Sequence, residues 1–97
     1  MDAIKDFALW EFGILEHRIF FLRRWPQERH VERLHLGDLG LDTIFYNGHT
    51  TNCDALWSGL PVITMTGVTW ASRVTESLYN GLGIHEQVKG WLVTDSL

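Results

Sequence analysis

A stretch of small polar residues in the middle of the chain has the composition of a phosphate-binding turn. Residues 47–57 have the sequence NGHTTNCDALW and directly follow an apolar segment with the composition of a β-strand. Ligands of α/β proteins bind beyond the carboxyl ends of the strands, and a helix N-terminus there attracts anions. Gly48 would let the backbone approach a phosphate, while Thr50 and Thr51 would add hydroxyl donors. One turn further on, Asp54 could accept hydrogen bonds from ribose hydroxyls.

The same residues could instead serve the fold alone. Thr51, followed three positions later by Asp54 and then an apolar residue, has the spacing of a capping box. In that motif, side chains satisfy the free N–H groups of a first helical turn. A short motif of this kind also occurs frequently without any functional role. The spacing therefore leaves a phosphate site and a helix cap as two open interpretations.

A second polar group follows Pro26. Gln27, His30 and Arg33 are spaced at i, i+3 and i+6, so a helix places an amide, an imidazole and a guanidinium on one face. Such a face could contact a base and its phosphates. The alternative is a solvated face, which is the commoner fate of polar residues on an amphipathic helix.

The five histidines and the single cysteine show no metal-binding pattern. His30 and His35 are five residues apart and no HExxH motif occurs, so we expect no metal site. Cys53 would lie in the first turn of a helix with His49 four residues before it, a setting that can activate a thiol. A lone cysteine more commonly packs as a small buried apolar residue, which is what we expect of Cys53.

Hydrophobic patterning predicts that strands and helices alternate along the chain. Three segments have the composition of β-strands: residues 19–22, 39–45 and 62–65. Four have the spacing or end signals of helices: residues 2–12, 26–36, 54–58 and 69–82. The alternation predicts an α/β fold, a partial Rossmann-like parallel sheet with flanking helices.

Two of these segments are expected to be buried. Residues 19–22 form a continuous apolar run, which is typical of an inner parallel strand covered on both faces. In the last helix, Trp70, Val74 and Leu78 recur at steps of four, which predicts a stripe that faces the core.

The two ends of the alternation lack their expected neighbours. The opening helix has no strand before it to complete a βαβ unit. Thr94, Asp95 and Ser96 have the residue types that cap a helix, yet the sequence stops at Leu97. We therefore expect both ends to be truncated, with residues 1–97 forming part of a larger domain.

Composition indicates an ordinary folded protein and disfavours several partner classes. The 97 residues allow one small domain, with 45% hydrophobic and 21% charged residues. A net charge of -4 gives no basic field for a nucleic-acid backbone, although five arginines crowd residues 18–33. No apolar run approaches the roughly 20 residues that span a bilayer. One cysteine fits a reducing compartment, so we expect a cytoplasmic protein without nucleic-acid or membrane partners.

Several segments together resemble one enzyme family. They are LDT at 41–43, NGHTT at 47–51, DALWSGLPVIT at 54–64, Gly67, and ASRV at 71–74. In order and spacing, these segments closely resemble the catalytic region of protein O-GlcNAc transferases. The likeness runs from about residue 13 to about residue 83 and weakly to residue 96. A motif set this long is far more specific than either polar group by itself.

The resemblance implies a fold and a donor substrate. Members of this family have two Rossmann-like lobes in the glycosyltransferase-B arrangement and use no metal or other cofactor. Their carboxyl-terminal lobe holds UDP-GlcNAc, and the chain is similar to part of that lobe. The NGH of residues 47–49 favours the GlcNAc-transferring branch over the related SPINDLY-type fucosyltransferases, which generally lack it.

The resemblance also assigns UDP-binding roles to the first polar group. His49, Thr50 and Thr51 would line the diphosphate and uridine. Asp54 would bind the ribose hydroxyls. These roles agree with those that the residue types and their position after a strand suggest.

The second polar group receives roles by the same resemblance. His30 and Arg33 would lie on the uracil side, and the backbone around Trp25 and Pro26 would border the base. Gln27 stands where the best-known members carry a lysine on the ribose side. This departure is expected to change nucleotide affinity more than the identity of the ligand.

No catalytic residue of the family falls within the matched region. The lysine that neutralises the leaving diphosphate lies upstream of it, and neither Lys5 nor Lys89 aligns with that lysine. In the implied reaction, a serine or threonine hydroxyl of an acceptor protein attacks the anomeric carbon with inversion while the enzyme stabilises departing UDP. That reaction needs the other lobe and, commonly, a helical-repeat arm as partners. We therefore expect the chain alone to hold UDP-GlcNAc without transferring sugar.

A different class of function remains as the alternative. The chain could be a diverged interaction module that keeps the fold without catalysis. In that case the polar groups would serve only as helix caps and solvated surface.

Overall fold

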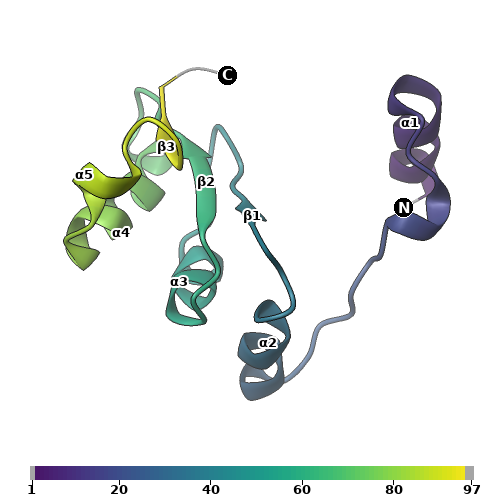
Figure 1. The fold of residues 1–97 in the computed structure, drawn as a ribbon, viewed down its shortest axis with the longest axis horizontal. Helices are drawn as coiled ribbons and strands as arrows, with labels where there is room; N and C mark the ends of the chain where they lie inside the picture. The colour runs from purple at the N-terminus through teal and green to yellow at the C-terminus, as the bar shows by residue number, and fades with distance from the viewer. Residues whose placement is uncertain (1, 96–97) are drawn as a thin grey trace.

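The computed structural model describes residues 2–95 as a three-stranded sheet with helices around it (Figure 1). The strands are β1 (Gly40–Leu41), β2 (Val62–Met65) and β3 (Val93–Thr94). Their spatial order is β1-β2-β3, and both neighbouring pairs are parallel. This arrangement confirms the predicted α/β class, with β2 as the central strand.

The helices pack mainly against β2 and against one another. Within the described residues the helical segments are α1 (Asp2–Phe12), η1 (Glu16–Arg18), α2 (Gln27–Leu34), α3 (Thr50–Trp57), η2 (Trp70–Ser72), α4 (Val74–Leu82) and α5 (His85–Val88). α2 packs against α3, and α4 packs against both β2 and α5. Figure 1 shows α3 below β2 with α2 beside it, and α4 and α5 at the β3 side of the sheet.

One buried tyrosine ties α4 to the central strand. The side chain of Tyr79 is only 1% exposed. Its hydroxyl donates to the Val62 carbonyl oxygen at 2.6 Å and accepts from the Val62 N–H at 3.0 Å. The ring packs with Val88, Leu92 and Val93, so one core cluster lies between α4, α5 and the sheet. Another buried cluster joins α3 to β2 through Ala55, Leu60 and Val62.

The predicted inner strand at residues 19–22 is wrong. The segment forms no strand, and Phe20 and Leu22 are 79% and 71% exposed. An extended segment becomes a strand only when its N–H and C=O groups pair with a neighbouring strand. Within residues 2–95 no strand lies beside it. The apolar composition indicates a preference for β-structure, but it does not show whether a neighbouring strand is present to pair with the segment.

The third strand is instead β3, which the sequence analysis did not predict. A strand of two residues is too short to show a periodic pattern. Long-range backbone bonds define it: Thr64 N–H donates to the Leu92 carbonyl at 2.8 Å, and Thr66 N–H to the Thr94 carbonyl at 2.7 Å. Thr94, one of the residues expected to cap a further helix, is thus the last residue of β3 and Asp95 follows it, while Ser96 lies outside the described residues.

Other predicted elements exist with altered bounds. The strand expected over 39–45 is confined to β1, because the chain leaves the sheet at Asp42, whose side chain accepts from the next N–H, that of Thr43, at 2.9 Å. The helix expected over 54–58 begins four residues earlier. The helix expected over 69–82 is divided into η2 and α4 at Arg73, where φ is -125° and ψ is 8°.

The stripe predicted to face the core in this last segment is also wrong. Trp70 is 75% exposed, and Val74 and Leu78 are only half-buried. The buried residues of α4 are Thr75 and Tyr79. α4 therefore turns a partly polar face to the sheet, because hydrogen bonds to neighbouring elements satisfy both side chains and offset the cost of burying them.

The first helix makes little contact with the rest. α1 has no buried residue, and Figure 1 shows it standing apart from the sheet, joined to α2 through an extended segment. Its interactions are local, such as the ion pair of 3.5 Å between Lys5 and Glu16. No helix within residues 2–95 is long and apolar enough to cross a membrane.

Candidate functional site at the N-terminus of α3

The site predicted from the NGHTT segment lies where β1 and β2 end and α3 begins. α3 starts at Thr50, with His49 as its N-cap residue and no side chain bonded to the free N–H groups of the first turn. Thr50 and Thr51 are exposed in that turn. Thr51 lies inside the helix rather than before it, so the capping-box interpretation is wrong for this helix. The first turn keeps its donors for another acceptor.

A partly buried carboxylate shapes the turn that leads into α3. Asp42 follows β1, and its Oδ1 accepts from the Gly48 N–H at 3.0 Å and from Asn52 Nδ2 at 2.9 Å. Asn52 itself is buried within α3. The carboxylate therefore joins the end of β1 both to the turn and to the helix.

The second oxygen of Asp42 bonds to β2 and to α4. Oδ2 accepts from the Thr64 hydroxyl at 2.7 Å and from the Thr75 hydroxyl at 2.6 Å. Asn52 Nδ2 also donates to Thr75 Oγ1 at 2.8 Å. We call Asp42, Asn52, Thr64 and Thr75 the Asp42 cluster. It connects β1, β2, α3 and α4 at the carboxyl edge of the sheet.

The cluster keeps Asp42 ionised. Burial by itself opposes ionisation, but the hydrogen bonds just described, that from Thr75 first, outweigh it and hold the pKa of Asp42 below its usual 3.8. Because the pKa of Asp42 is lower in the folded chain than in the unfolded chain, the ionised group stabilises the fold at pH values above 3.8. That contribution is lost as pH falls through the folded value.

The role expected of Gly48 changes with this geometry. Its N–H donates to Asp42 and is not offered to a ligand. A Cβ at this position would lie 2.7 Å from Asn52 Oδ1, and the Asn52 side chain is fixed by its own hydrogen bonds. Gly48 is thus needed for close packing of Asn52 rather than for approach to a phosphate.

Gly48→Ala is therefore expected to destabilise the fold by about 1–3 kcal/mol, the usual cost of overpacking. Gly81→Ala is the matched control, because a Cβ there meets nothing within 4 Å and alanine favours the helix by about 0.5–1 kcal/mol. Denaturant unfolding of both variants measures the difference. Equal stability of the two variants would contradict the packing role of Gly48.

His49 is held between aromatic rings. Its imidazole stacks on Tyr46 with centroids 5.0 Å apart and planes 7° apart, and it meets Trp70 edge-on at 6.2 Å. Its Nε2 is buried without a hydrogen-bond partner in the described chain. A buried polar atom of this kind usually has a partner, so His49 has a nitrogen to offer a ligand.

The structure also brings parts of the two predicted polar groups together. His30 of α2 faces Asp54 of α3, with Nε2 4.0 Å from Oδ2, and both side chains are largely buried at 25% and 18% exposed. The packing of α2 on α3 produces this pair. The expected uracil-side and ribose-side residues are therefore neighbours.

The other two residues of the second polar group, Arg33 and Gln27, are not part of the His30–Asp54 pair. The Arg33 guanidinium donates to the Arg23 carbonyl at 2.6 Å and lies over the Trp25 ring, 5.1 Å from its centroid. It therefore supports the segment that enters α2, which the resemblance places beside the base. Gln27 is exposed at the start of α2.

Sequence analysis missed the residues that position this site. Asn47 is 1% exposed, donates through Nδ2 to the Thr43 carbonyl at 2.8 Å and accepts from the Thr75 N–H at 3.3 Å. Together with the bonds from Gly48 and Asn52 to Asp42 it fixes the turn before α3. The only signal was the presence of Asp42 and Asn47 in the family-like segments. Nothing in the local spacing links either residue to Thr75, some 30 positions away.

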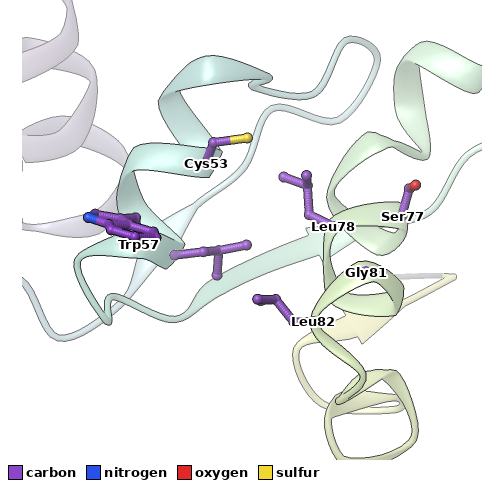
Figure 2. Close-up of a pocket in the computed structure, with 7 residues that line it drawn as sticks. Cys53, Trp57, Ser77, Leu78, Gly81 and Leu82 are labelled. Atoms are coloured by element: carbon purple, nitrogen blue, oxygen red, sulfur yellow. The ribbon is translucent and has the colours of Figure 1, made fainter.

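An apolar pocket of about 400 Å³ lies between α3 and α4, separate from these polar residues. It is lined by Cys53, Leu56, Trp57, Ser77, Leu78, Gly81 and Leu82. Figure 2 shows Cys53 and Trp57 on one side and Leu78, Gly81 and Leu82 on the other. The expectation that Cys53 is buried is wrong, because α3 turns this side chain toward the pocket rim, where it is exposed. Within residues 2–95, no three His, Cys, Asp or Glu side chains gather at a metal-binding distance.

Known proteins with similar sequences share the enzyme family suggested above. The sequence pattern of glycosyl transferase family 41 matches residues 2–91. A UDP-N-acetylglucosamine–peptide N-acetylglucosaminyltransferase of Caenorhabditis elegans is 45% identical over 87 residues, which are 90% of this chain and 8% of that protein. A probable enzyme of the same name, SEC of Arabidopsis thaliana, is 39% identical over 72 residues, which are 74% of this chain and 7% of that protein.

A solved structure agrees with the sequence comparisons. An O-GlcNAc transferase mutant from Thermobaculum terrenum superposes with a TM-score of 0.82 and 33% identity, over 98% of this chain and 17% of its own. The chain thus spans only a small part of the proteins that it matches. Because the family pattern covers nearly the whole sequence and the fold is shared over nearly all of it, this chain belongs to glycosyl transferase family 41.

Proposed function

We propose that this chain is the nucleotide-binding part of a protein O-GlcNAc transferase-like lobe and that it binds the UDP portion of UDP-GlcNAc. The observation that carries the proposal is the uncapped N-terminus of α3, where the first-turn donors and the exposed Thr50 and Thr51 stand free. A helix N-terminus with free donors suits a diphosphate. The unpartnered Nε2 of His49 adds a nitrogen in the residue just before that turn.

The nucleoside would lie toward α2. Asp54 is one turn into α3, where a carboxylate can accept hydrogen bonds from both ribose hydroxyls. His30 beside it offers an imidazole face to the base, and the Trp25 ring, held by Arg33, borders the same side. The chain itself binds and orients the leaving nucleotide, and in family members the acceptor hydroxyl and the diphosphate-neutralising lysine come from elsewhere.

Titration with a nucleotide series tests this proposal. We expect UDP to bind more tightly than uridine, because the diphosphate gains the α3 donors, and GDP to bind more weakly than UDP. Tighter binding of GDP would instead indicate a fucose-type donor. His30→Ala should weaken both UDP and uridine, whereas His35→Ala, at the exposed end of α2, serves as the matched control. If no uridine nucleotide binds in calorimetry, the chain is an interaction module and the proposal fails.

The isolated chain is expected to bind the donor without transferring sugar to serine or threonine of acceptor proteins. Transfer requires a second lobe that closes over donor and acceptor and excludes water. The measurement is release of UDP from UDP-GlcNAc in the presence of an acceptor peptide. Turnover above the rate in buffer would contradict the expectation and place a complete catalytic apparatus within these 97 residues.

A further inference from the structure

We propose that Asp42 is a positioning residue for the nucleotide, fixing the turn at residues 48–51 from which α3 presents its donors. This inference rests on the proposed function, since it concerns the same binding site. It starts from the observation that one carboxylate accepts hydrogen bonds from the turn, from α3, from β2 and from α4.

Asp42 has no capacity left to bind a ligand itself. Its two oxygens accept from five donors, which are the N–H groups of Thr43 and Gly48, the Asn52 amide, and the hydroxyls of Thr64 and Thr75. A carboxylate offers about four lone-pair directions. Asp42 is thus saturated by the protein, and any effect on UDP must pass through the groups that it holds.

Two of those groups set the geometry of the proposed diphosphate site. The Gly48 N–H lies in the residue before His49, and Asn52 lies in the first turn of α3 with Thr50 and Thr51. Bonds to an ionised acceptor are roughly twice as strong as neutral ones. The carboxylate therefore fixes both ends of the segment that carries the diphosphate-binding residues.

The sign of the effect separates positioning from a simple charge effect. A negative charge close to the start of α3 repels a diphosphate, so neutralising Asp42 would strengthen UDP binding if the field of the carboxylate were all that mattered. Under the positioning role, neutralisation loosens the turn and weakens binding. The isosteric change Asp42→Asn therefore gives opposite results for the two cases.

The matched control is Thr64→Val. It removes one donor to Oδ2 from the β2 side and preserves shape, while the Oδ1 bonds to Gly48 and Asn52 remain. Both changes weaken the same buried cluster, so both are expected to lower the midpoint of unfolding. Only Asp42→Asn weakens the bonds from Gly48 and Asn52 that hold the turn, because it replaces an ionised acceptor by a neutral one.

The experiment combines UDP calorimetry, evaluated per folded molecule, with hydrogen exchange of the Gly48 amide in the 97-residue chain. Asp42→Asn should raise the Kd for UDP about tenfold and speed Gly48 exchange at least tenfold, whereas Thr64→Val should change each by less than about twofold. An unchanged or lower Kd in Asp42→Asn would overturn the proposal.

Two further measurements keep the result decisive. If Asp42→Asn fails to fold, Asn52→Ala replaces it, because it removes the direct link between Asp42 and α3. Asn52→Ala should raise the Kd for UDP about fivefold, and an unchanged Kd overturns the proposal.

If the unaltered chain binds no UDP, the proposed function fails by itself. The structural part is then judged from the amide signals of Gly48, Thr50 and Thr51, which must shift in Asp42→Asn and stay in place in Thr64→Val. If they shift equally in both, the positioning role is wrong.

Discussion

Replacing Thr50 or Thr51 by alanine is expected to weaken UDP binding about tenfold or more and to leave uridine binding almost unchanged. Loss of a hydrogen bond to a charged group costs about 1.5–3 kcal/mol, which is at least tenfold in affinity. Both hydroxyls are exposed in the uncapped first turn of α3, so neither stabilises the fold through a cap. Stability should change by only about 0.5 kcal/mol.

The contrast between the two ligands makes this test independent of folding. Asp54→Ala should weaken UDP and uridine alike, because both contain the ribose. Ser77→Ala removes an exposed hydroxyl from α4, outside the expected site, and provides the control. If UDP and uridine lose affinity equally in the threonine variants, the hydroxyls do not bind phosphate, and the proposed position of the diphosphate is wrong.

Replacing Tyr79 by phenylalanine is expected to cost about 1–3 kcal/mol of stability, a large fraction of what a domain of this size has. The hydroxyl pairs with both the N–H and the C=O of Val62, at the start of β2, before the residues Thr64 and Met65 that pair with β3. Phenylalanine keeps the packing but leaves both backbone groups buried without a partner. Denaturant unfolding measures the loss.

Tyr46→Phe is the matched control for this change. Tyr46 is 65% exposed, so removal of its hydroxyl should leave the free energy of unfolding unchanged within about 0.5 kcal/mol. Comparable losses in both variants would contradict the assigned role of Tyr79.

The pH dependence of stability gives a second measurement of the same hydroxyl. Burial raises the pKa of Tyr79 above its usual 10.0, the bond with the Val62 backbone opposes this, and the charge of Asp42 adds to it. Because the pKa of Tyr79 is higher in the folded chain, the neutral hydroxyl contributes fully to the free energy of unfolding below pH 10.0. This contribution is lost as pH rises through the folded pKa. Tyr79→Phe should therefore lack part of the alkaline loss of stability seen in the unaltered chain.

Sequence patterns were reliable where the cause was local. The helices α1 and α2 and the strand β2 lie where spacing and end signals predicted them, because Pro26, the glycine after α1 and apolar periodicity act within a few positions. The family was also evident, since the order of many short segments along the chain is itself sequence information. Of the candidate site residues, His30 and Asp54 are brought together by the packing of α2 on α3, while the nucleotide-binding roles that the resemblance implies for them stay predictions.

Contacts between residues far apart in the sequence decided which other segments became strands. The run at 19–22 has strand composition but no neighbour to pair with, whereas β3 became a strand through bonds from β2 despite its short length. Sheet pairing depends on which segments meet, and local composition carries no record of that.

The amino-acid sequence by itself determined the α/β class, the family and the polar residues that we propose for a nucleotide site. The tertiary structure alone decided how those residues are held. Asp42 accepts from the Thr75 hydroxyl, 33 positions away, at 2.6 Å, where α4 turns a polar residue inward, and its other oxygen accepts from the Gly48 N–H. The physical reason is that a buried polar group is tolerated only where its partners converge in space. That convergence arises from the packing of β1, β2, α3 and α4 together and is absent from any local pattern.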